Sequence, residues 1–156
     1  MIYKGRNNYK ENYARLLMGN KRDKKNKEIE KPEKILIESL KKMNEFKKVK
    51  FIILYGSYAY GKPSKLSDYD FCIYYEGNRN EQFKFRLKAL SKLPDNFDVQ
   101  IFQNLPLYVR KETLRGKLVY YKELTFVYDV AYETIKEFDE FKKYYLDYIN
   151  TRRLAV

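Results

Sequence analysis

The sequence predicts an α+β fold in which a small mixed β-sheet is backed by helices, with helical extensions at both ends. Short apolar, β-branched runs that end at Gly or Pro are typical of buried strands. Between them lie segments whose apolar residues recur every three or four positions, which is typical of helices. The 156 residues suit one compact domain, and the 44% that are apolar are enough to build its core.

The first 31 residues are expected to form a basic N-terminal helix and linker. Asn8 to Met18 can form a short helix that Gly19 would end, and the stretch up to Lys31 is almost entirely charged or polar. Residues 1–50 hold 16 Lys and Arg against 7 Asp and Glu. This excess favours a nucleotide, RNA or an acidic protein surface as partner. The alternative is a lysine-rich surface that is simply solvated.

The central domain is predicted to span residues 32–122. Pro32 fits the first turn of a helix running to about Lys48, with Leu36, Leu40 and Met43 on its apolar face. The segment 123–156 contains no Gly or Pro and is predicted to be a C-terminal helix that packs on the domain or on a partner. The other elements are expected in the order strand 49–55, strand 68–75, helix 80–93, strand 97–102, helix 106–115 and strand 118–121.

Two residue counts exclude several kinds of chemistry. The chain has no His and a single Cys, Cys72, which lies among apolar residues and is expected in the core. A disulfide framework, a Cys/His zinc site and imidazole catalysis are therefore excluded, so carboxylates, Lys, Tyr or Ser must act. No signal peptide or membrane-length apolar run is visible, so a cytoplasmic protein without membrane contact is expected.

Asp68 and Asp70 are the strongest candidate catalytic and metal-binding residues. Side chains alternate along a strand, so both would lie on one face with Cα atoms roughly 7 Å apart. Carboxylates this close repel each other unless a cation neutralises them. Hard oxygen ligands suit Mg²⁺, and such a pair can hold two ions about 3.5–4 Å apart. A capped turn leading into the strand is the alternative role for these aspartates.

Gly56 and Ser57 follow the first strand and are candidates for binding phosphates. A glycine lets the backbone approach a phosphate closely, and the Ser57 hydroxyl with nearby amides can bind the β and γ oxygens. Residues 56–62 also resemble a Walker A loop, but Pro63 replaces its Ser or Thr and removes the Mg²⁺-binding hydroxyl.

Asp98 would join the two aspartates if its strand neighbours theirs, as a metal ligand or proton acceptor. Otherwise it is a plain turn residue.

These residues resemble the signature of the minimal nucleotidyltransferases of the DNA polymerase β superfamily. The signature is Gly-Ser, ten residues, Asp-x-Asp and a later third acid, matched here by Gly56-Ser57, Asp68, Asp70 and Asp98. Gly61 and Ser67 also fit the pattern, and the resemblance covers roughly residues 33–123. It implies a polymerase β-like fold and Mg²⁺-dependent transfer of a nucleotidyl group from ATP or another nucleoside triphosphate.

The resemblance also implies a partner. Many minimal members are antitoxins paired with a HEPN-family RNase, and some adenylylate that toxin on tyrosine. The chain departs from the family at Tyr60, where Arg is frequent, and at Lys62, where an acid is frequent. Lys62, Lys65 or a residue of the partner would then supply the missing positive charge, with Lys62 and Ser67 as candidate triphosphate ligands. Transfer to RNA or a small molecule, and binding without turnover, are the alternative functions.

Overall fold

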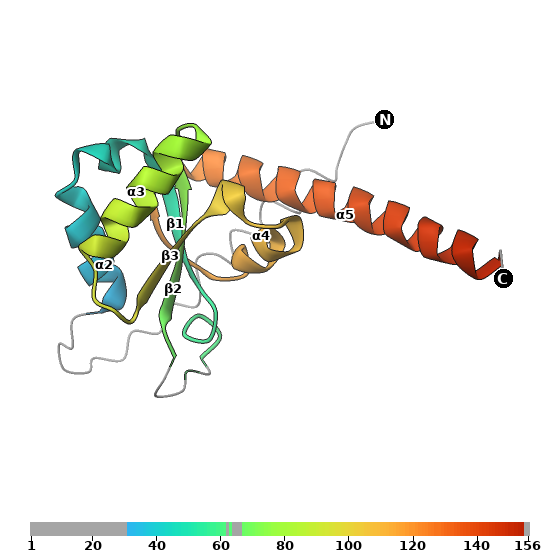
Figure 1. Ribbon diagram of the computed structural model, residues 1–156, viewed down its shortest axis with the longest axis horizontal. Helices are drawn as coiled ribbons and strands as arrows, with labels where there is room; N and C mark the ends of the chain where they lie inside the picture. The colour runs from blue at the N-terminus through green and yellow to red at the C-terminus, as the bar shows by residue number, and fades with distance from the viewer. Residues whose placement is uncertain (1–30, 62, 64–66, 155–156) are drawn as a thin grey trace.

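The computed structural model describes residues 31–61, 63 and 67–154, and within them the predicted α+β architecture is confirmed. Helices α2 and α3 cover one face of a four-stranded sheet, and α4 and α5 cover the other (Figure 1). The N-terminal helix expected before residue 31 lies outside the described residues. The elements, in chain order, are α2 (Pro32–Lys41), the 3-10 helix η1 (Asn44–Lys48), β1 (Val49–Tyr55), β2 (Tyr69–Tyr75), α3 (Arg79–Ser91), β3 (Phe97–Ile101), the 3-10 helix η2 (Phe102–Asn104), α4 (Leu107–Thr113), β4 (Lys117–Tyr121) and α5 (Leu124–Leu154).

The sheet is mixed, with the strand order β3-β2-β1-β4. β1 pairs antiparallel with both β2 and β4, whereas β2 and β3 run parallel and are joined by α3. β1 is a central strand covered on both faces, which explains its continuous apolar sequence from Phe51 to Leu54. β2 and β3 begin at the end of the sheet where β1 finishes, and this arrangement positions the candidate site.

One predicted element is shorter than expected. The helix that begins at Pro32 ends at Lys41 rather than near Lys48, and the 3-10 helix η1 follows it. Met43 adopts an extended backbone at this break and is only 4% exposed. The extended residue turns the chain toward β1 while its side chain stays in the core, so the apolar spacing continues after the helix has ended.

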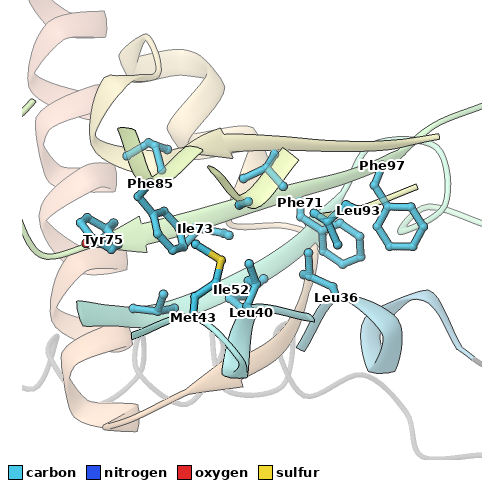
Figure 2. Packing of buried hydrophobic residues seen from close by; sticks show 14 of the residues in the cluster. Leu36, Leu40, Met43, Ile52, Phe71, Ile73, Tyr75, Phe85, Leu93 and Phe97 are labelled. Carbon is cyan, nitrogen blue, oxygen red and sulfur yellow. The ribbon is translucent and has the colours of Figure 1, made fainter. Parts of the chain in front are cut away.

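The core is divided by the sheet into two clusters. On the α2 and α3 side, Phe71 and Ile73 of β2 pack against Leu36, Leu40 and Phe85 (Figure 2). Burying side chains of this size contributes about 1.5–3 kcal/mol each, and this cluster anchors β2 in the sheet. The opposite cluster joins the sheet to α4 and α5 through Phe51, Ile53, Cys72, Phe102, Leu114, Val127 and Ala131.

α5 is 31 residues long and packs on the sheet only along its first half. Its buried residues are Val127, Ala131 and Thr134, one position away from several of the large apolar side chains that mark its sequence. The second half projects past the sheet (Figure 1) and exposes aromatic rings such as Phe141 and Tyr145. In the described part of the chain, no helix is both long and apolar enough to cross a membrane.

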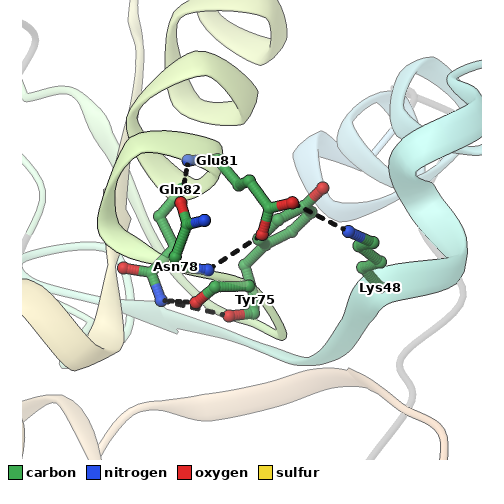
Figure 3. A network of polar contacts seen from close by, with 6 residues as sticks. Lys48, Tyr75, Asn78, Glu81 and Gln82 are labelled. Atoms are coloured by element: carbon green, nitrogen blue, oxygen red, sulfur yellow. Dashed lines mark hydrogen bonds and ion pairs between the residues drawn. The ribbon is translucent and has the colours of Figure 1, made fainter.

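The start of α3 is fixed by its own side chains. Asn78 accepts a hydrogen bond from the Glu81 backbone N–H, and the Glu81 carboxylate accepts one from the Asn78 N–H, both at 2.9 Å. This reciprocal capping box satisfies two donors that a helix start otherwise leaves unpaired. The Nζ atom of Lys48 lies 3.4 Å from Oε1 of the same carboxylate (Figure 3). The helix therefore runs back along the sheet toward β3 from a well-defined first residue.

Candidate active site

The candidate site lies where β1 ends and β2 and β3 begin. The parallel register of β2 and β3 places Asp70 directly opposite Asp98. The antiparallel register of β1 and β2 places Tyr55 opposite Asp70 on the other side. The condition under which Asp98 would join Asp70, that its strand neighbours β2, is therefore met, and two carboxylates share one face of the sheet.

Gly56 brings the backbone of the following turn onto the Asp70 carboxylate. Its φ is +72°, in the left-handed region that favours glycine. A Cβ at this position would lie 2.3 Å from Oδ2 of Asp70, closer than atoms can approach. Glycine is thus required here both by the backbone angle and by the neighbouring carboxylate, and no side chain separates the turn from the acid.

Two tyrosines hold this turn from opposite sides of the sheet. The Tyr58 ring packs on Tyr69 of β2 with ring centres 4.1 Å apart. The Tyr60 hydroxyl donates to the backbone carbonyl of Glu112 in α4 at 3.2 Å. Ser57, half-buried, lies just before both anchors. Tyr60, a departure from the resembled pattern, therefore has a structural partner, and the Gly-Ser turn is fixed relative to the two carboxylates.

The charges around Asp70 are poorly compensated. Burial raises the pKa of the Asp70 carboxyl, and the negative charges of Asp98 and then Asp68 raise it further. Burial likewise raises the pKa of the Tyr55 phenol, to which Cys72, Asp70 and Asp98 add smaller contributions. A cation placed beside Asp70 would relieve this repulsion, so the electrostatics fit a metal ion.

Asp98 has two partners that sequence reasoning missed. Gln100, two residues along β3, donates from Nε2 to Oδ2 of Asp98 at 3.0 Å. Arg86 of α3 places Nη2 3.7 Å from Oδ1 of the same carboxylate. Gln100 could have been found, because residues two apart share one face of a strand. The sequence pattern does not predict the contact of Arg86 with Asp98, because that contact depends on how α3 lies along the edge of the sheet.

The remaining predicted residues are less closely gathered. Asp68 lies one residue before β2 and is exposed, and Ser67 beside it is half-buried. Lys62 lies outside the described residues. Across residues 31–61, 63 and 67–154, no three acidic or Cys side chains are arranged as a finished metal site. The structure thus brings Asp70, Asp98 and Gly56 together, whereas a three-carboxylate centre including Asp68 remains a prediction.

Sequence comparison identifies relatives of this chain. The family model described as "Polymerase beta, Nucleotidyltransferase" matches residues 33–124. A Methanocaldococcus jannaschii protein, named as a candidate protein adenylyltransferase, is 36% identical over 101 residues, which are 64% of this chain and 72% of that protein. The segment that the family model matches contains Gly56, Ser57, Asp68, Asp70 and Asp98, all predicted site residues.

Solved structures share the fold. A chain of a toxin–antitoxin crystal structure with AMP-PNP aligns with a TM-score of 0.60 at 19% identity, covering 76% of this chain and 96% of that one. A chain of the MntA-HepT toxin–antitoxin structure gives 0.55 at 16%, covering 77% and 95%. A chain of the tri-AMPylated Shewanella oneidensis HEPN toxin in complex with MNT antitoxin gives 0.54 at 17%, covering 77% and 94%. At these identities the likeness establishes the fold.

Proposed function

Because this chain belongs to the polymerase β nucleotidyltransferase family, we propose that it transfers AMP from ATP to a hydroxyl group of a partner protein. The observation that carries the proposal is the pairing of Asp70 with Asp98 directly beneath the Gly56 turn. Two comparisons support ATP as donor and protein as acceptor. One is the relative named as a protein adenylyltransferase, and the other is the complex of an AMPylated toxin, one chain of which shares this fold.

Asp68, Asp70 and Asp98 would hold Mg²⁺, as two ions. The raised pKa of Asp70, caused by burial and by its acidic neighbours, is the observation that fits a cation here. Bound there, Mg²⁺ would supply charge neutralisation for the triphosphate and for the attacking oxygen. The exposure of Asp68 leaves it accessible to a nucleotide arriving from solvent.

The other site residues bind and orient the nucleotide. The backbone of Gly56 and the hydroxyl of Ser57 would bind the β and γ phosphate oxygens, with Ser67 and Lys62 as further ligands. The acceptor oxygen forms a bond to the α phosphorus, and the bond from that phosphorus to the bridging oxygen of the β phosphate breaks. Pyrophosphate leaves, and Asp98 accepts the proton of the acceptor hydroxyl.

We further propose that the acceptor is a HEPN-type toxin and that the protein acts in the cytoplasm as its antitoxin. Residues 32–122 would form the catalytic domain, residues 1–31 a basic extension, and residues 123–156 a helix that also contacts the partner. The projecting half of α5 supports contact with a partner, because the side chains of Phe141 and Tyr145 are 57% and 53% exposed there. Exposed aromatic rings are enriched where proteins bind one another.

The test is transfer of label from α-labelled ATP to a co-expressed HEPN-type partner in the presence of Mg²⁺. Wild-type protein is expected to label the partner, and the double substitution Asp68→Asn, Asp70→Asn is expected to abolish labelling. Asp95→Asn, an exposed aspartate in the turn before β3, is the matched control and should label normally. Persistent labelling by the double variant would sink the mechanism. Label that survives protease but not RNase would assign RNA as the acceptor instead.

A further inference from the structure

The side chain of Arg86 reaches around the edge of the sheet to the candidate site. β3 is an edge strand, and Arg86 projects from α3, which packs along it. Its Nε donates to the Val99 backbone carbonyl at 2.6 Å, which fixes the guanidinium beside the strand. Its Nη2 then lies 3.7 Å from Oδ1 of Asp98 on the face that carries the site. One side chain thus links the backbone of β3 to the third carboxylate.

Both oxygens of the Asp98 carboxylate therefore face a partner from this chain. Gln100 Nε2 donates to Oδ2, and the Arg86 guanidinium faces Oδ1. The two partners approach from different elements, so together they limit rotation of the carboxylate.

A purely structural role explains this geometry less well. An ion pair with a separation of 3.7 Å between groups that are 29% and 36% exposed contributes little to stability. The short bond to Val99 could tie α3 to the strand without any charge near Asp98. The guanidinium instead lies where it can hold the Asp98 side chain in one orientation, which is how groups behind a reacting residue act on a site.

We propose that Arg86 is a positioning residue that, with Gln100, holds the Asp98 carboxyl group in the orientation it uses toward the reacting groups. This inference rests on the proposed function, in which Asp98 would be a metal ligand and would accept the proton of the acceptor hydroxyl. Arg86 acts through Asp98 and does not itself contact the nucleotide.

The kinetic test is a double-mutant cycle of Arg86→Ala and Asp98→Asn. Arg86→Ala is expected to lower kcat about 10- to 100-fold with an unchanged KM for ATP. In the Asp98→Asn background, the same substitution should have no further effect, because the group it positions is gone. Equal losses in both backgrounds would overturn the inference. Arg86→Lys should restore part of the rate, and Arg79→Ala, an exposed arginine of the same helix, is the control.

The second measurement does not depend on catalysis. The side-chain amide of Gln100 reports on the Asp98 carboxylate it binds, and its NMR signals should shift in Arg86→Ala and Asp98→Asn but not in Arg79→Ala. Unchanged amide signals in Arg86→Ala would contradict positioning. If the wild-type protein transfers no nucleotide while these signals shift as expected, the proposed function fails and the positioning by Arg86 stands.

Discussion

The two ends of β2 place carboxylates in opposite electrostatic environments. At its start, the pKa of Asp70 is raised by burial and by the neighbouring aspartates. Just past its end, the pKa of Glu76 is lowered by a hydrogen bond from Lys50, whose Nζ lies 3.0 Å from Oε2. The pKa of Glu81 is lowered chiefly by the Asn78 backbone N–H and also by Lys48 (Figure 3).

The opposite pKa shifts distinguish carboxylates that stabilise the fold from carboxylates whose charge a bound ligand would balance. Glu76 and Glu81 have cationic and backbone partners within the chain, so their charges are already balanced. Asp70 has acidic neighbours instead, and a protein keeps such a group at a net cost to stability when a function requires it. The sequence holds 33 Lys and Arg against 21 Asp and Glu. Even so, the charge of Asp70 is raised in energy by acidic neighbours rather than balanced by a basic one.

The largest expected effect comes from neutralising one acid at each end. Asp70→Asn should lower nucleotidyl transfer on the order of 10³-fold, the size of effect seen when a group that stabilises transition-state charge is removed. Glu76→Gln, at the other end of the same strand, should leave transfer unchanged. Steady-state rates with labelled ATP check the pair, and equal losses in both variants would remove the distinction between the ends.

Gly56→Ala should have the next largest effect. The substitution strains a backbone with φ of +72° and drives a methyl group into the Asp70 carboxylate. Gly61→Ala is a matched control, because its φ is +69° but no atom of the residues that the structure describes lies within 4 Å of the added methyl. Both variants should lose about 1–2 kcal/mol of unfolding free energy from the left-handed backbone. Only Gly56→Ala should also lose transfer, by about 10- to 100-fold; equal activity in the two would show that the close approach to Asp70 is unimportant.

The smallest effect is a difference in how stability depends on pH. The pKa of Glu81 is lower in the folded than in the unfolded chain, so its contribution is present above its ordinary value of 4.5 and is lost as pH falls. Glu81→Gln should therefore lower Tm at pH 7, and by a smaller amount as the pH falls below 4.5. The pKa of Asp70 is raised, so ionising it costs stability as pH rises. Asp70→Asn should then raise Tm at pH 7 relative to wild type; the same sign for both variants would contradict the comparison.

Most of the fold could be predicted from the sequence, because strand and helix patterns are local. The strand containing Phe51 to Leu54 is marked by continuous apolar residues, and Pro32 marks a helix start. The end of that helix at Lys41 could not be predicted, because Met43 keeps the helical apolar spacing while its backbone is already extended. Because the Met43 side chain is needed in the core, the apolar spacing of the sequence continues past the point where the backbone leaves the helix.

The site could be predicted in part for the same reason. The spacing of Gly56, Ser57, Asp68 and Asp70 is local, whereas the position of Asp98 depends on the parallel register of β2 and β3, which local pattern does not specify. The partners of Asp98 divide similarly. Gln100 follows from strand alternation, but Arg86 reaches Asp98 only because α3 lies along the edge of the sheet.

Calorimetric titration of Mg²⁺ with a non-hydrolysable ATP analogue tests most directly the claim that Asp70 belongs to a ligand site and Glu76 does not. Mg²⁺-dependent binding is predicted for the wild-type protein and for Glu76→Gln, and its loss is predicted for Asp70→Asn. Circular dichroism of the three proteins controls for folding. Equal binding by all three would contradict the account, as would the absence of Mg²⁺-dependent binding in the wild-type protein.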